Sequence, residues 1–448
     1  MCGFLLTNKK IQASYSVHET LKNRGPDETK IVNLNGMTFI HTLLSMTGEH
    51  TAQPFVVGDK ICLFNGEIYN YLEKKQFRSD GYAILDSYEE KGVKFIEDLD
   101  GEYAIVIVDL MEGCVLFCTD IFGIKPLYMS IEGDDFIFCS SKESIYELGF
   151  DNIIRCQPNS LFKMNLSDLS VHRICSLHEF DLRQHKNSFE DWNVKFIQSI
   201  SKRFQDTGHD IILPLSSGHD SGAIACAFDF LGIEYYSYSF YGTENRKILD
   251  ERIEKKMNKM PFPNYTFVRE RLEGNDRINA SELLKKRCTS FSYGPDLDEK
   301  NHKHKGFSDP GALGLTHILN HVKIINKKIK ILASGQGGDE VTTNLQTYKF
   351  GNPNPSIFPK NLSSVFPWEN FYYGAQSSYL SKEESISGGF GIEGRYPLLD
   401  KDVVQEFLWL TADLKNSSYK APITNFLKQH KYPHSDGDPR TFKRGFNV

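Results

Sequence analysis

The stretch Ile211-Ile212-Leu213-Pro214-Leu215-Ser216-Ser217-Gly218-His219-Asp220-Ser221-Gly222 joins a short apolar run to a loop of small residues and then to a helical pattern. The run 211–215 is typical of a buried strand, and residues 222–231 are typical of a helix. A loop of small residues at this junction can hold an anion, because backbone N–H groups and the helix dipole face the ligand. Ser216 and Ser221 add hydroxyl donors. A plain tight turn is the alternative, and the G-K-[ST] of a Walker loop is absent.

Residues on both sides of this stretch alternate between helix and strand patterns. Helices are expected at 192–204, 246–259 and 311–326, and strands at 235–240 and 329–333. Such alternation predicts a parallel α/β sheet. Residues 288–310 and 342–368 are rich in Gly, Pro, Asn and Ser, and we expect them to form long loops, which are often functional.

The first 180 residues have a different rhythm, in which short apolar runs alternate with turn residues. This pattern predicts strands at 38–44, 60–64, 103–109, 115–119, 136–140 and 160–164, with helices at 70–79 and 81–91. The polar segment 180–188 is typical of a linker. A chain of 448 residues is too long for one core. We therefore expect two domains, residues 2–180 and 188–448.

Composition and charge exclude several classes of protein. The net charge of −6 disfavours a general role in binding nucleic acid or a membrane surface. The nine cysteines form no C-x-x-C pair, which disfavours a disulfide framework or a structural zinc and predicts a reducing cytoplasm. No apolar run approaches the length of a membrane span, and the first residues do not resemble an export signal.

The chain begins Met1-Cys2-Gly3-Phe4, and the cysteine is small enough for Met1 to be removed. Removal would place a free α-amino group on the residue that carries the thiol. That amine, with a pKa of about 8, is a built-in general base, so nucleophile and base come from one residue. A chance cysteine at position 2 is the alternative.

Three turn motifs follow Cys2, namely Arg24-Gly25-Pro26-Asp27, Asn65-Gly66-Glu67-Ile68-Tyr69-Asn70 and Asp100-Gly101. Singly, each is ordinary hairpin chemistry. Together with Cys2 they indicate a catalytic site. A thiolate that attacks an amide carbonyl creates an oxyanion, which needs hydrogen-bond donors. The Asn65 amide and the Gly66 N–H can donate to that oxyanion. Glu67 or Asp100 can pair with an α-ammonium group on the substrate.

These motifs, with Phe122-Gly123-Ile124-Lys125-Pro126-Leu127-Tyr128, resemble the glutaminase domain of class II glutamine amidotransferases across residues 2–142. The resemblance implies the αββα sandwich of N-terminal-nucleophile hydrolases. It also implies that Cys2 releases ammonia from glutamine through a thioester, with Asn65 and Gly66 as the oxyanion hole.

One position departs from that family. An arginine that grips the glutamine α-carboxylate usually stands in the strand His41-Thr42-Leu43-Leu44-Ser45, where this chain has Leu43. A leucine cannot pair with a carboxylate, so another residue fills the role, glutamine binds weakly, or the donor differs. His41 and His50 are candidates on sequence alone, and a structural histidine is the alternative for each.

The loop 216–221 resembles the pyrophosphate-binding S-G-G-x-D-S loop of ATP pyrophosphatases, with Ser217 in place of the first glycine. Downstream, Ser334-Gly335-Gln336-Gly337-Gly338-Asp339-Glu340 resembles the second signature of asparagine synthetases and β-lactam synthetases. The resemblance implies a Rossmann-like α/β domain in which Ser216, Gly218, Ser221 and Gly335 bind the phosphates of ATP. Asp220 and Asp339 would hold Mg²⁺ at the carboxyl ends of neighbouring strands.

Residues 391–400 resemble the G-I-E-x-R-x-P-x-L-D motif of the same family. Lys420 falls where the family places a lysine on the phosphates of the adenylate, and Lys443 matches a tail motif. A solvated surface lysine is the alternative for each. The whole chain resembles glutamine-hydrolysing asparagine synthetase, which implies that one domain hydrolyses glutamine and the other adenylates a carboxylate with ATP. Ammonia then passes between them and displaces AMP.

The resemblance weakens where the acceptor should bind. Gln336 replaces an acidic residue and cannot act as a base, and neither residues 291–310 nor the segment after Glu340 follows the family pattern. We expect a cytoplasmic glutamine-dependent amidotransferase that uses ATP and Mg²⁺, with aspartate as the leading acceptor. The alternatives are another carboxylate such as a sugar acid or a natural-product intermediate, a β-lactam-synthetase-like amide former, or a non-catalytic relative. A homodimer is compatible with the sequence, which leaves the oligomeric state open.

Overall fold

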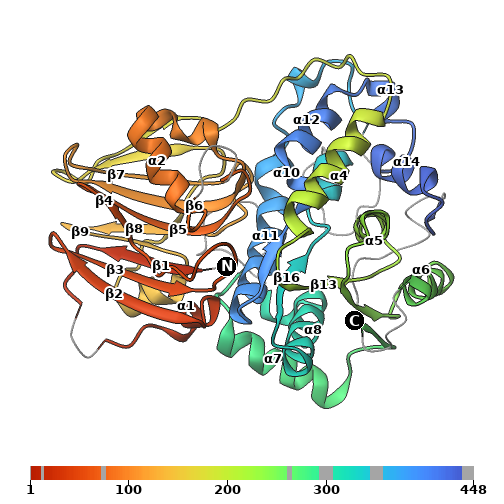
Figure 1. Ribbon diagram of the computed structural model, residues 1–448, viewed down its shortest axis with the longest axis horizontal. Coiled ribbons are helices and arrows are strands. Elements are labelled where there is room, and N and C mark those ends of the chain that lie inside the picture. Colours follow the sequence, from red (N-terminus) through yellow and green to blue (C-terminus); the bar gives the residue numbers. More distant parts are fainter. Residues whose placement is uncertain are drawn as a thin grey trace. The chain divides into compact units, whose positions relative to one another are not determined.

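The chain folds into an antiparallel β unit and a parallel α/β unit (Figure 1). A computed structural model describes residues 2–11, 15–71, 77–259, 265–291, 306–343 and 357–435. The first unit comprises residues 1–179, 286–291 and 384–393, and the second comprises residues 180–285, 292–383 and 394–448. The first unit therefore includes two short segments from beyond the expected boundary at 180–188.

The first unit contains two antiparallel six-stranded sheets. One has the order β10-β8-β9-β1-β3-β2, with strands Ile154–Arg155, Tyr128–Glu132, Asp135–Cys139, Gly3–Thr7, Met37–Leu43 and Glu28–Leu34. The other has the order β12-β11-β7-β6-β5-β4, with strands Val171–Cys175, Leu161–Asn165, Cys114–Thr119, Gly101–Asp109, Lys60–Ile68 and Phe55–Val57. Gly3 pairs with Thr42, so Cys2 lies at the start of β1 beside the end of β3.

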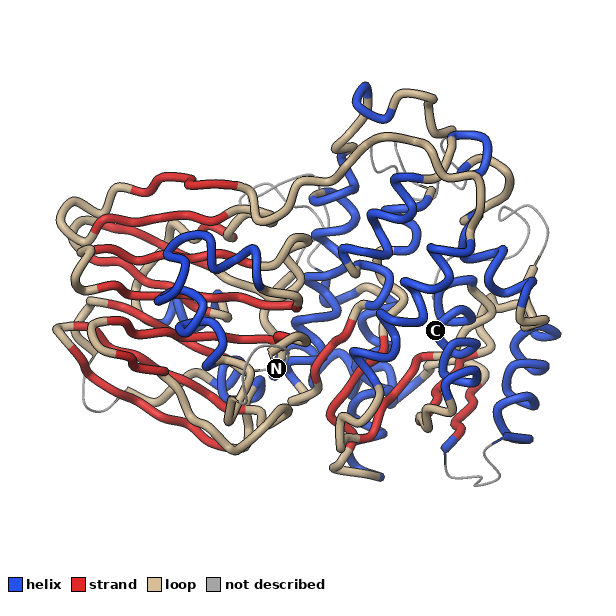
Figure 2. The backbone as a smooth tube through the Cα atoms, turned by 45° about the horizontal axis from the view of Figure 1, so that its top comes forward, coloured by secondary structure: helices blue, strands red, loops and turns tan. Residues whose placement is uncertain are grey.

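Three apolar cores define the layers of this unit. Phe4 and Phe39 of one sheet pack with Leu63 and Phe117 of the other, so the sheets face each other across a shared core. A second core joins the β5–β6 sheet to α2 (Tyr82–Lys91) and η1 (Gly92–Asp98). A third joins the β1–β3 sheet to α1 (Glu19–Arg24) and α3 (Lys142–Glu147). The predicted αββα sandwich is confirmed, and Figure 2 shows its strands as stacked layers.

The helix predicted at 70–79 is wrong over the described residues. Asn70 and Tyr71 lie in a turn, and residues 77–80 form a loop, while residues 72–76 lie outside the described part of the chain. The Asn70 side chain donates to the Asp98 carbonyl at 2.8 Å and accepts from the Asp100 N–H at 3.0 Å. Such side chain–backbone bonds compete with helix formation. The helix predicted at 81–91 is confirmed as α2.

The second unit is built on a five-stranded sheet of order β15-β14-β13-β16-β17. Its strands are Thr266–Arg269, Tyr236–Phe240, Asp210–Pro214, Ile329–Ala333 and Glu393–Arg395. β13 is parallel to both β14 and β16, and β14 is parallel to β15, which confirms the predicted parallel α/β fold. The carboxyl ends of β13 and β16 therefore lie at one edge of the sheet, where α/β proteins bind their ligands.

Helices surround this sheet. They are α4 Glu190–Phe204, α5 His219–Leu231, α6 Arg246–Lys259, α7 Gly274–Arg287, α8 Pro310–Ile325, α9 Gly338–Thr342, α10 Glu369–Tyr372, α11 Gly374–Gly389, α12 Lys401–Trp409, α13 Ala412–Lys415 and α14 Ala421–Gln429. Both α5 and α8 contact β13. The described ends of the two expected long loops contain the 3₁₀ turns Gly306–Ser308 and Leu362–Ser364, and their central parts lie outside the described residues. Among the described helices, none combines the length and apolar character needed to cross a bilayer.

Candidate active sites

Cys2 lies buried at the head of β1, where its thiol donates to the Leu44 carbonyl over 3.7 Å. Burial raises the pKa of the Cys2 thiol to about 11, and the charges of Glu393 and Asp80 act in the same direction. The thiol is therefore neutral at physiological pH in the chain that retains Met1. A nearby base must remove its proton before it can attack a carbonyl.

A buried ion cluster fixes the backbone of Cys2. Arg24 donates from Nε to the Cys2 carbonyl at 3.3 Å and from Nη1 to the Glu384 carbonyl at 3.2 Å. The Glu384 carboxylate faces Arg24 at 3.8 Å and Lys125 at 3.0 Å, and Lys125 lies 3.6 Å from Glu102. All four side chains are at most 2% exposed, so each charge depends on its partners in this cluster.

Asn65 and Gly66 lie in β5, where they pair with Ala104 and Tyr103 of β6, and β5 also contacts β1. Asn65 is completely buried, and neither its amide oxygen nor its nitrogen has a hydrogen-bond partner among the described residues. A buried amide without partners is rare and points to a ligand. Gly66 has φ of +138°, and a Cβ there would lie 1.9 Å from the Glu102 carbonyl oxygen, so only glycine fits.

Asp80 is a buried acid near Cys2 that the sequence analysis missed. It accepts from the Ile68 N–H at 3.0 Å and from the Gly81 N–H at 2.9 Å. Burial raises the pKa of Asp80 to about 7. Its position after the wrongly predicted helix at 70–79 hid it, although Ser79-Asp80-Gly81 is a common start of a helix.

The two acids predicted to bind glutamine lie at the same end of the β5–β6 strand pair. Glu67 is buried in β5 and accepts from the Thr47 hydroxyl. Asp100 is only half-buried. It lies just before β6, next to Gly101, which pairs with Ile68 of β5. A Cβ at Gly101 would lie 2.1 Å from the Glu67 carbonyl oxygen, so the Asp100-Gly101 motif has a packing role at this turn.

Leu43 and the two nearby histidines do not replace the arginine that the family uses to hold the glutamine carboxylate. Leu43, at the end of β3, is 5% exposed and packs as a core residue. Burial lowers the pKa of His41 to about 3, so its ring is neutral, and Nδ1 accepts from the Gln53 N–H at 3.3 Å. His50 is exposed and lies 2.7 Å from Glu28. Neither histidine is thus available as an unpaired cation for a carboxylate.

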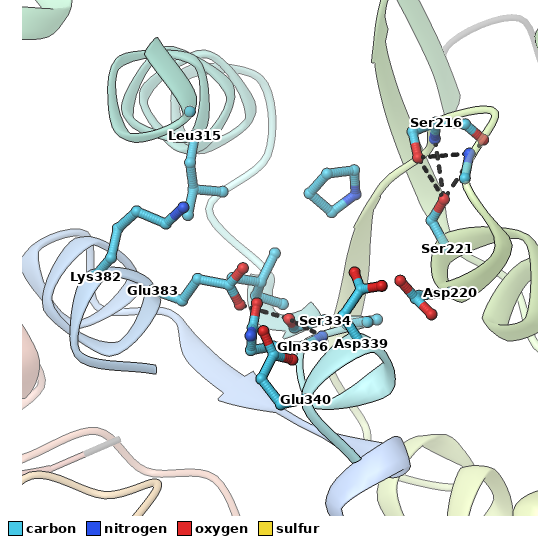
Figure 3. Close-up of a pocket in the computed structure, with 16 residues that line it drawn as sticks. Ser216, Asp220, Ser221, Leu315, Ser334, Gln336, Asp339, Glu340, Lys382 and Glu383 are labelled. Atoms are coloured by element: carbon cyan, nitrogen blue, oxygen red, sulfur yellow. Dashed lines mark hydrogen bonds between the residues drawn. The ribbon is translucent and has the colours of Figure 1, made fainter. Parts of the chain in front are cut away.

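In the second unit, residues 216–221, hereafter the anion loop, form a closed turn between β13 and α5. The Ser216 N–H donates to Ser221 Oγ at 3.2 Å, the Gly218 N–H donates to Ser216 Oγ at 3.2 Å, and the two hydroxyls lie 2.8 Å apart (Figure 3). Helix α5 begins at His219, three residues earlier than predicted, so Asp220 and Ser221 belong to its first turn. That turn carries the positive end of the helix dipole.

Lys420 joins the two acids predicted to hold the metal. Its ammonium lies 2.7 and 2.6 Å from the two Asp220 oxygens and 2.8 Å from Asp339 Oδ1. Burial alone would lower the pKa of Lys420, but the Asp220 and Asp339 carboxylates outweigh it and raise that pKa. The Tyr419 hydroxyl also donates to Asp339 at 2.8 Å. The structure therefore brings together three residues that are far apart in the sequence.

The glycines of the 334–340 segment let it approach the anion loop closely. A Cβ at Gly335 would lie 2.6 Å from the Asp220 Cβ, and one at Gly338 would lie 2.3 Å from Asp220 Oδ1. Both positions therefore require glycine if Asp220 is to keep its place beside Lys420. Gly337, with φ of +97°, lies between them and is the N-cap of helix α9.

A pocket of about 180 Å³ lies between the anion loop, residues 332–340 and helices α8 and α11. Figure 3 shows Ser216 and Ser221 on one side of it and Lys382 and Glu383 on the other. The Ser334 hydroxyl donates to Glu383 and accepts from the Gln336 N–H at 3.1 Å. Lys382 and Glu383 were not predicted, because a charged pair in a helix gives no signal in a single sequence.

The fit of a metal rests on Asp220 and Asp339. Within the described ranges, no group of three or more His, Cys, Asp or Glu residues can hold a metal unaided. Mg²⁺ usually takes one or two carboxylates together with substrate phosphates, so this pair suits a metal that arrives with a nucleotide. Lys443 lies outside the described residues.

Comparison with known proteins places these sites in a family. Residues 1–176 match the family model of a glutamine amidotransferase domain. "Putative asparagine synthetase (glutamine-hydrolyzing) 1" of Methanocaldococcus jannaschii is 24% identical, over 93% of this chain and 81% of the relative. "Putative asparagine synthetase (glutamine-hydrolyzing) 2" of the same organism is 30% identical, over 82% of this chain and 80% of the relative. "Asparagine synthetase (glutamine-hydrolyzing) 2" of Bacillus subtilis is 24% identical, over 93% of this chain and 68% of the relative.

These matches confirm the resemblance drawn from the motifs. They also confirm the predicted class of enzyme, an ATP-dependent carbon–nitrogen ligase that takes its nitrogen from glutamine. With two sites of matching chemistry and a relative that is 30% identical over most of its length, the chain belongs to the family of glutamine-hydrolysing asparagine synthetases.

Proposed function

We propose that the chain hydrolyses glutamine at Cys2 and uses the ammonia to convert aspartate to asparagine, with release of AMP and pyrophosphate. Residues 2–180 carry the first reaction and residues 188–448 the second. The observation that carries the proposal is the Lys420 ammonium held between Asp220 and Asp339 beside the anion loop. This arrangement suits a nucleotide whose phosphates displace the two carboxylates from the lysine or share it with them.

Glutamine hydrolysis begins with a proton transfer from the Cys2 thiol. Because burial raises the pKa of this thiol, we infer that Met1 is removed and that the freed α-amine of Cys2 takes the proton. The thiolate then attacks the side-chain carbonyl of glutamine. The Asn65 amide and the Gly66 N–H stabilise the oxyanion, the protonated Cys2 amine returns its proton to the departing nitrogen so that ammonia leaves, and water cleaves the thioester to glutamate. We add Asp80, whose charge acts on the Cys2 thiol, to Glu67 and Asp100 as an acid that holds the glutamine ammonium.

In the synthetase reaction the acceptor carboxylate attacks the α-phosphorus of ATP, and pyrophosphate leaves. The anion loop and the first turn of α5 hold the leaving pyrophosphate, and Lys420 balances the charge that develops on the phosphates. Asp220 and Asp339 would hold Mg²⁺, which supplies further charge neutralisation when bound with ATP. We keep Lys443 as a proposed phosphate contact. Ammonia then attacks the acyl-adenylate and displaces AMP.

A second acceptor class has one observation in its favour. Gln336 lines the pocket with a neutral side chain where the family pattern has an acid. A neutral amide neither removes a proton from incoming ammonium nor repels an anionic acceptor. This change favours an acceptor other than aspartate, such as a sugar acid or another carboxylate metabolite.

The decisive experiment combines glutamine, ATP and Mg²⁺ with a panel of carboxylates, and measures glutamate, AMP and pyrophosphate. Aspartate should give the amide, AMP and pyrophosphate in equal amounts. Cys2→Ala should lose glutamine-dependent synthesis but keep synthesis from ammonium chloride. AMP formation with another carboxylate and not with aspartate would establish the second acceptor class, and no AMP with any acceptor would refute the ligase proposal.

Mass spectrometry of the purified chain tests the nucleophile separately. Loss of Met1 is expected, and retention of Met1 in an active glutaminase would refute the role of the Cys2 amine. All nine cysteines are free, which supports our placing of this reaction in the cytoplasm.

A further inference from the structure

We propose that Glu244 is a positioning residue that holds the anion loop in its phosphate-binding conformation through Ser217. The inference rests on the proposed ATP reaction of this site. It assigns a role to the serine that replaces the usual glycine, and to an acid in the turn between β14 and α6.

Ser217 is bound on both its backbone and its side chain by this turn. Glu244 Oε2 accepts from the Ser217 N–H at 2.7 Å and also from the Ser217 hydroxyl. The Asn245 N–H donates to the same hydroxyl at 3.1 Å. Three hydrogen bonds, two of them to a carboxylate, therefore tie a residue that is 7% exposed to residues 244–245. Ser217 thus contacts the protein and not the ligand.

Arg252 holds the same loop from helix α6. It is fully buried, and its Nη1 donates to the carbonyl oxygens of Ser216 and, at 2.8 Å, of Gly218. In a planar trans peptide the N–H points opposite to the carbonyl. Holding these two carbonyls toward Arg252 therefore turns the Ser217 N–H toward Glu244. The same geometry turns the His219 N–H, at the first turn of α5, away from Arg252.

The two charges support each other. Burial lowers the pKa of Arg252, and the nearby Tyr432 and Glu244 oppose that change. Space is also restricted, because a Cβ at Gly222 would lie 2.3 Å from Arg252 Nη2. Arg252, bound to the Ser216 and Gly218 carbonyl oxygens, and Glu244, bound to the Ser217 N–H, therefore set the orientation of the peptide groups in the anion loop.

The donors of the anion loop therefore have two different roles. The Ser217 N–H is used by Glu244, so phosphates must be bound by the other donors, which are the Ser216 and Ser221 hydroxyls and the first-turn N–H groups of α5. Without Glu244, the Ser217 peptide is free to rotate, and phosphate binding must first restore the loop. The expected signature is weaker phosphate binding with little change in the chemical step.

The test uses the full chain with Glu244→Gln, and Glu251→Gln as the matched control, because Glu251 is an exposed acid within α6. Calorimetry measures the binding of inorganic pyrophosphate and of ATP, each with Mg²⁺, and steady-state assays separate KM for ATP from kcat. Glu244→Gln removes the negative charge from the acceptor of both hydrogen bonds, and this loss of charge assistance should weaken both ligands about tenfold. It should raise KM for ATP to the same extent with little change in kcat. Glu251→Gln, and glutamine hydrolysis without ATP in both variants, should match the wild type.

Ser217→Ala provides a second, uncharged test if Glu244→Gln does not fold. It should weaken pyrophosphate binding by a few-fold, and the double variant should be no weaker than Glu244→Gln alone, because both changes break one unit. Unchanged or tighter pyrophosphate binding in Glu244→Gln or Ser217→Ala would overturn the inference while leaving the proposed function intact. A wild-type chain that binds neither ATP nor pyrophosphate would overturn both.

Discussion

At the scale of single residues, Leu43 is the clearest departure from the family, and its replacement by arginine tests the glutamine pocket. Leu43 is buried at the end of β3, beside the strand that begins after Cys2. If the pocket lacks a partner for the glutamine carboxylate, Leu43→Arg should lower KM for glutamine by about tenfold or more, since a charged hydrogen bond contributes roughly 1.5–3 kcal/mol. Leu43→Met serves as the control for packing. An unchanged KM in Leu43→Arg, with the melting temperature maintained, would mean that another residue already holds the carboxylate.

Asp80 gives a prediction about pH. Its carboxylate can hold the glutamine ammonium only when ionised, and burial raises its pKa to about 7. Glutamine affinity should therefore be highest above about pH 7 and should fall as the pH drops, by up to about tenfold per unit well below the pKa. The measurement is equilibrium binding of glutamine to Cys2→Ala, which removes both hydrolysis and the titration of the thiol. Cys2→Ala/Asp80→Asn should bind weakly with a flat profile. A pH-dependent profile that survives the second change would exclude Asp80.

The residues that the sequence predicted and those it missed differ in a physical way. Cys2, Asn65 and Asp220 belong to short motifs, such as a strand followed by a Gly-rich turn, whose local sequence already indicates a function. Asp80, Lys382 and Glu383 belong to ordinary helical or loop segments, and only the fold brings them to a site. A single sequence contains no record of that proximity.

At the scale of elements, Lys420 immediately precedes helix α14 and contacts Asp220 at the start of α5 and Asp339 at the start of α9. Lys420 precedes Ala421 with φ of +47°, a strained conformation for a residue with a side chain, and Pro422 follows in the first turn. Strain of this kind is maintained when surrounding contacts require it, and here the two carboxylates do so. The position of the lysine is thus set by α5, α9 and α14 together.

Lys420→Met should abolish the ATP-dependent step while leaving glutamine hydrolysis unchanged. The side chain keeps its length but loses its charge, so Asp220 and Asp339 then repel each other and repel the phosphates. We expect AMP formation to fall by a factor of about 100 or more, in line with the loss of one preorganised charged donor. Lys428→Met, an exposed lysine in the same helix, is the control. AMP formation within a few-fold of wild type would refute a role for Lys420 in the reaction.

Element prediction succeeded where the pattern was regular. Strands β13, β14 and β16 of the parallel sheet follow from buried apolar runs, and α4 and α6 follow from helical patterns, whereas the short strands β15 and β17 were not predicted. The start of α5 was placed three residues late, because His219, Asp220 and Ser221 have no apolar period of their own. The error matters for function, since the early start places His219, Asp220 and Ser221 of the anion loop in the first turn of α5, whose N–H groups are the proposed phosphate donors.

At the scale of the whole molecule, the first unit draws on residues that a linear boundary cannot assign to it. Residues 286–291 and 384–393 lie far beyond the expected linker at 180–188, yet they belong to the unit that contains Cys2. Their contribution includes Glu384, the counter-ion of Arg24 and Lys125. A composition shift near residue 180 predicts a linker, but it gives no sign that later residues belong to the first unit.

Glu384→Gln tests whether this returning segment stabilises the first unit and its nucleophile. The change removes the carboxylate that faces Arg24 at 3.8 Å and Lys125 at 3.0 Å, in a cluster where every side chain is at most 2% exposed. Loss of one member of a buried ion cluster costs roughly 3 kcal/mol or more, because a buried charge is left without compensation. We therefore expect a lower midpoint of urea unfolding and a reduced kcat for glutamine hydrolysis, since Arg24 also holds the Cys2 carbonyl.

Glu89→Gln breaks the exposed Lys60–Glu89 pair of the same unit and should change neither property measurably. Glu384→Asp, which keeps the charge, should restore part of both, and if it instead matched Glu384→Gln, packing rather than charge would be the contribution of this residue.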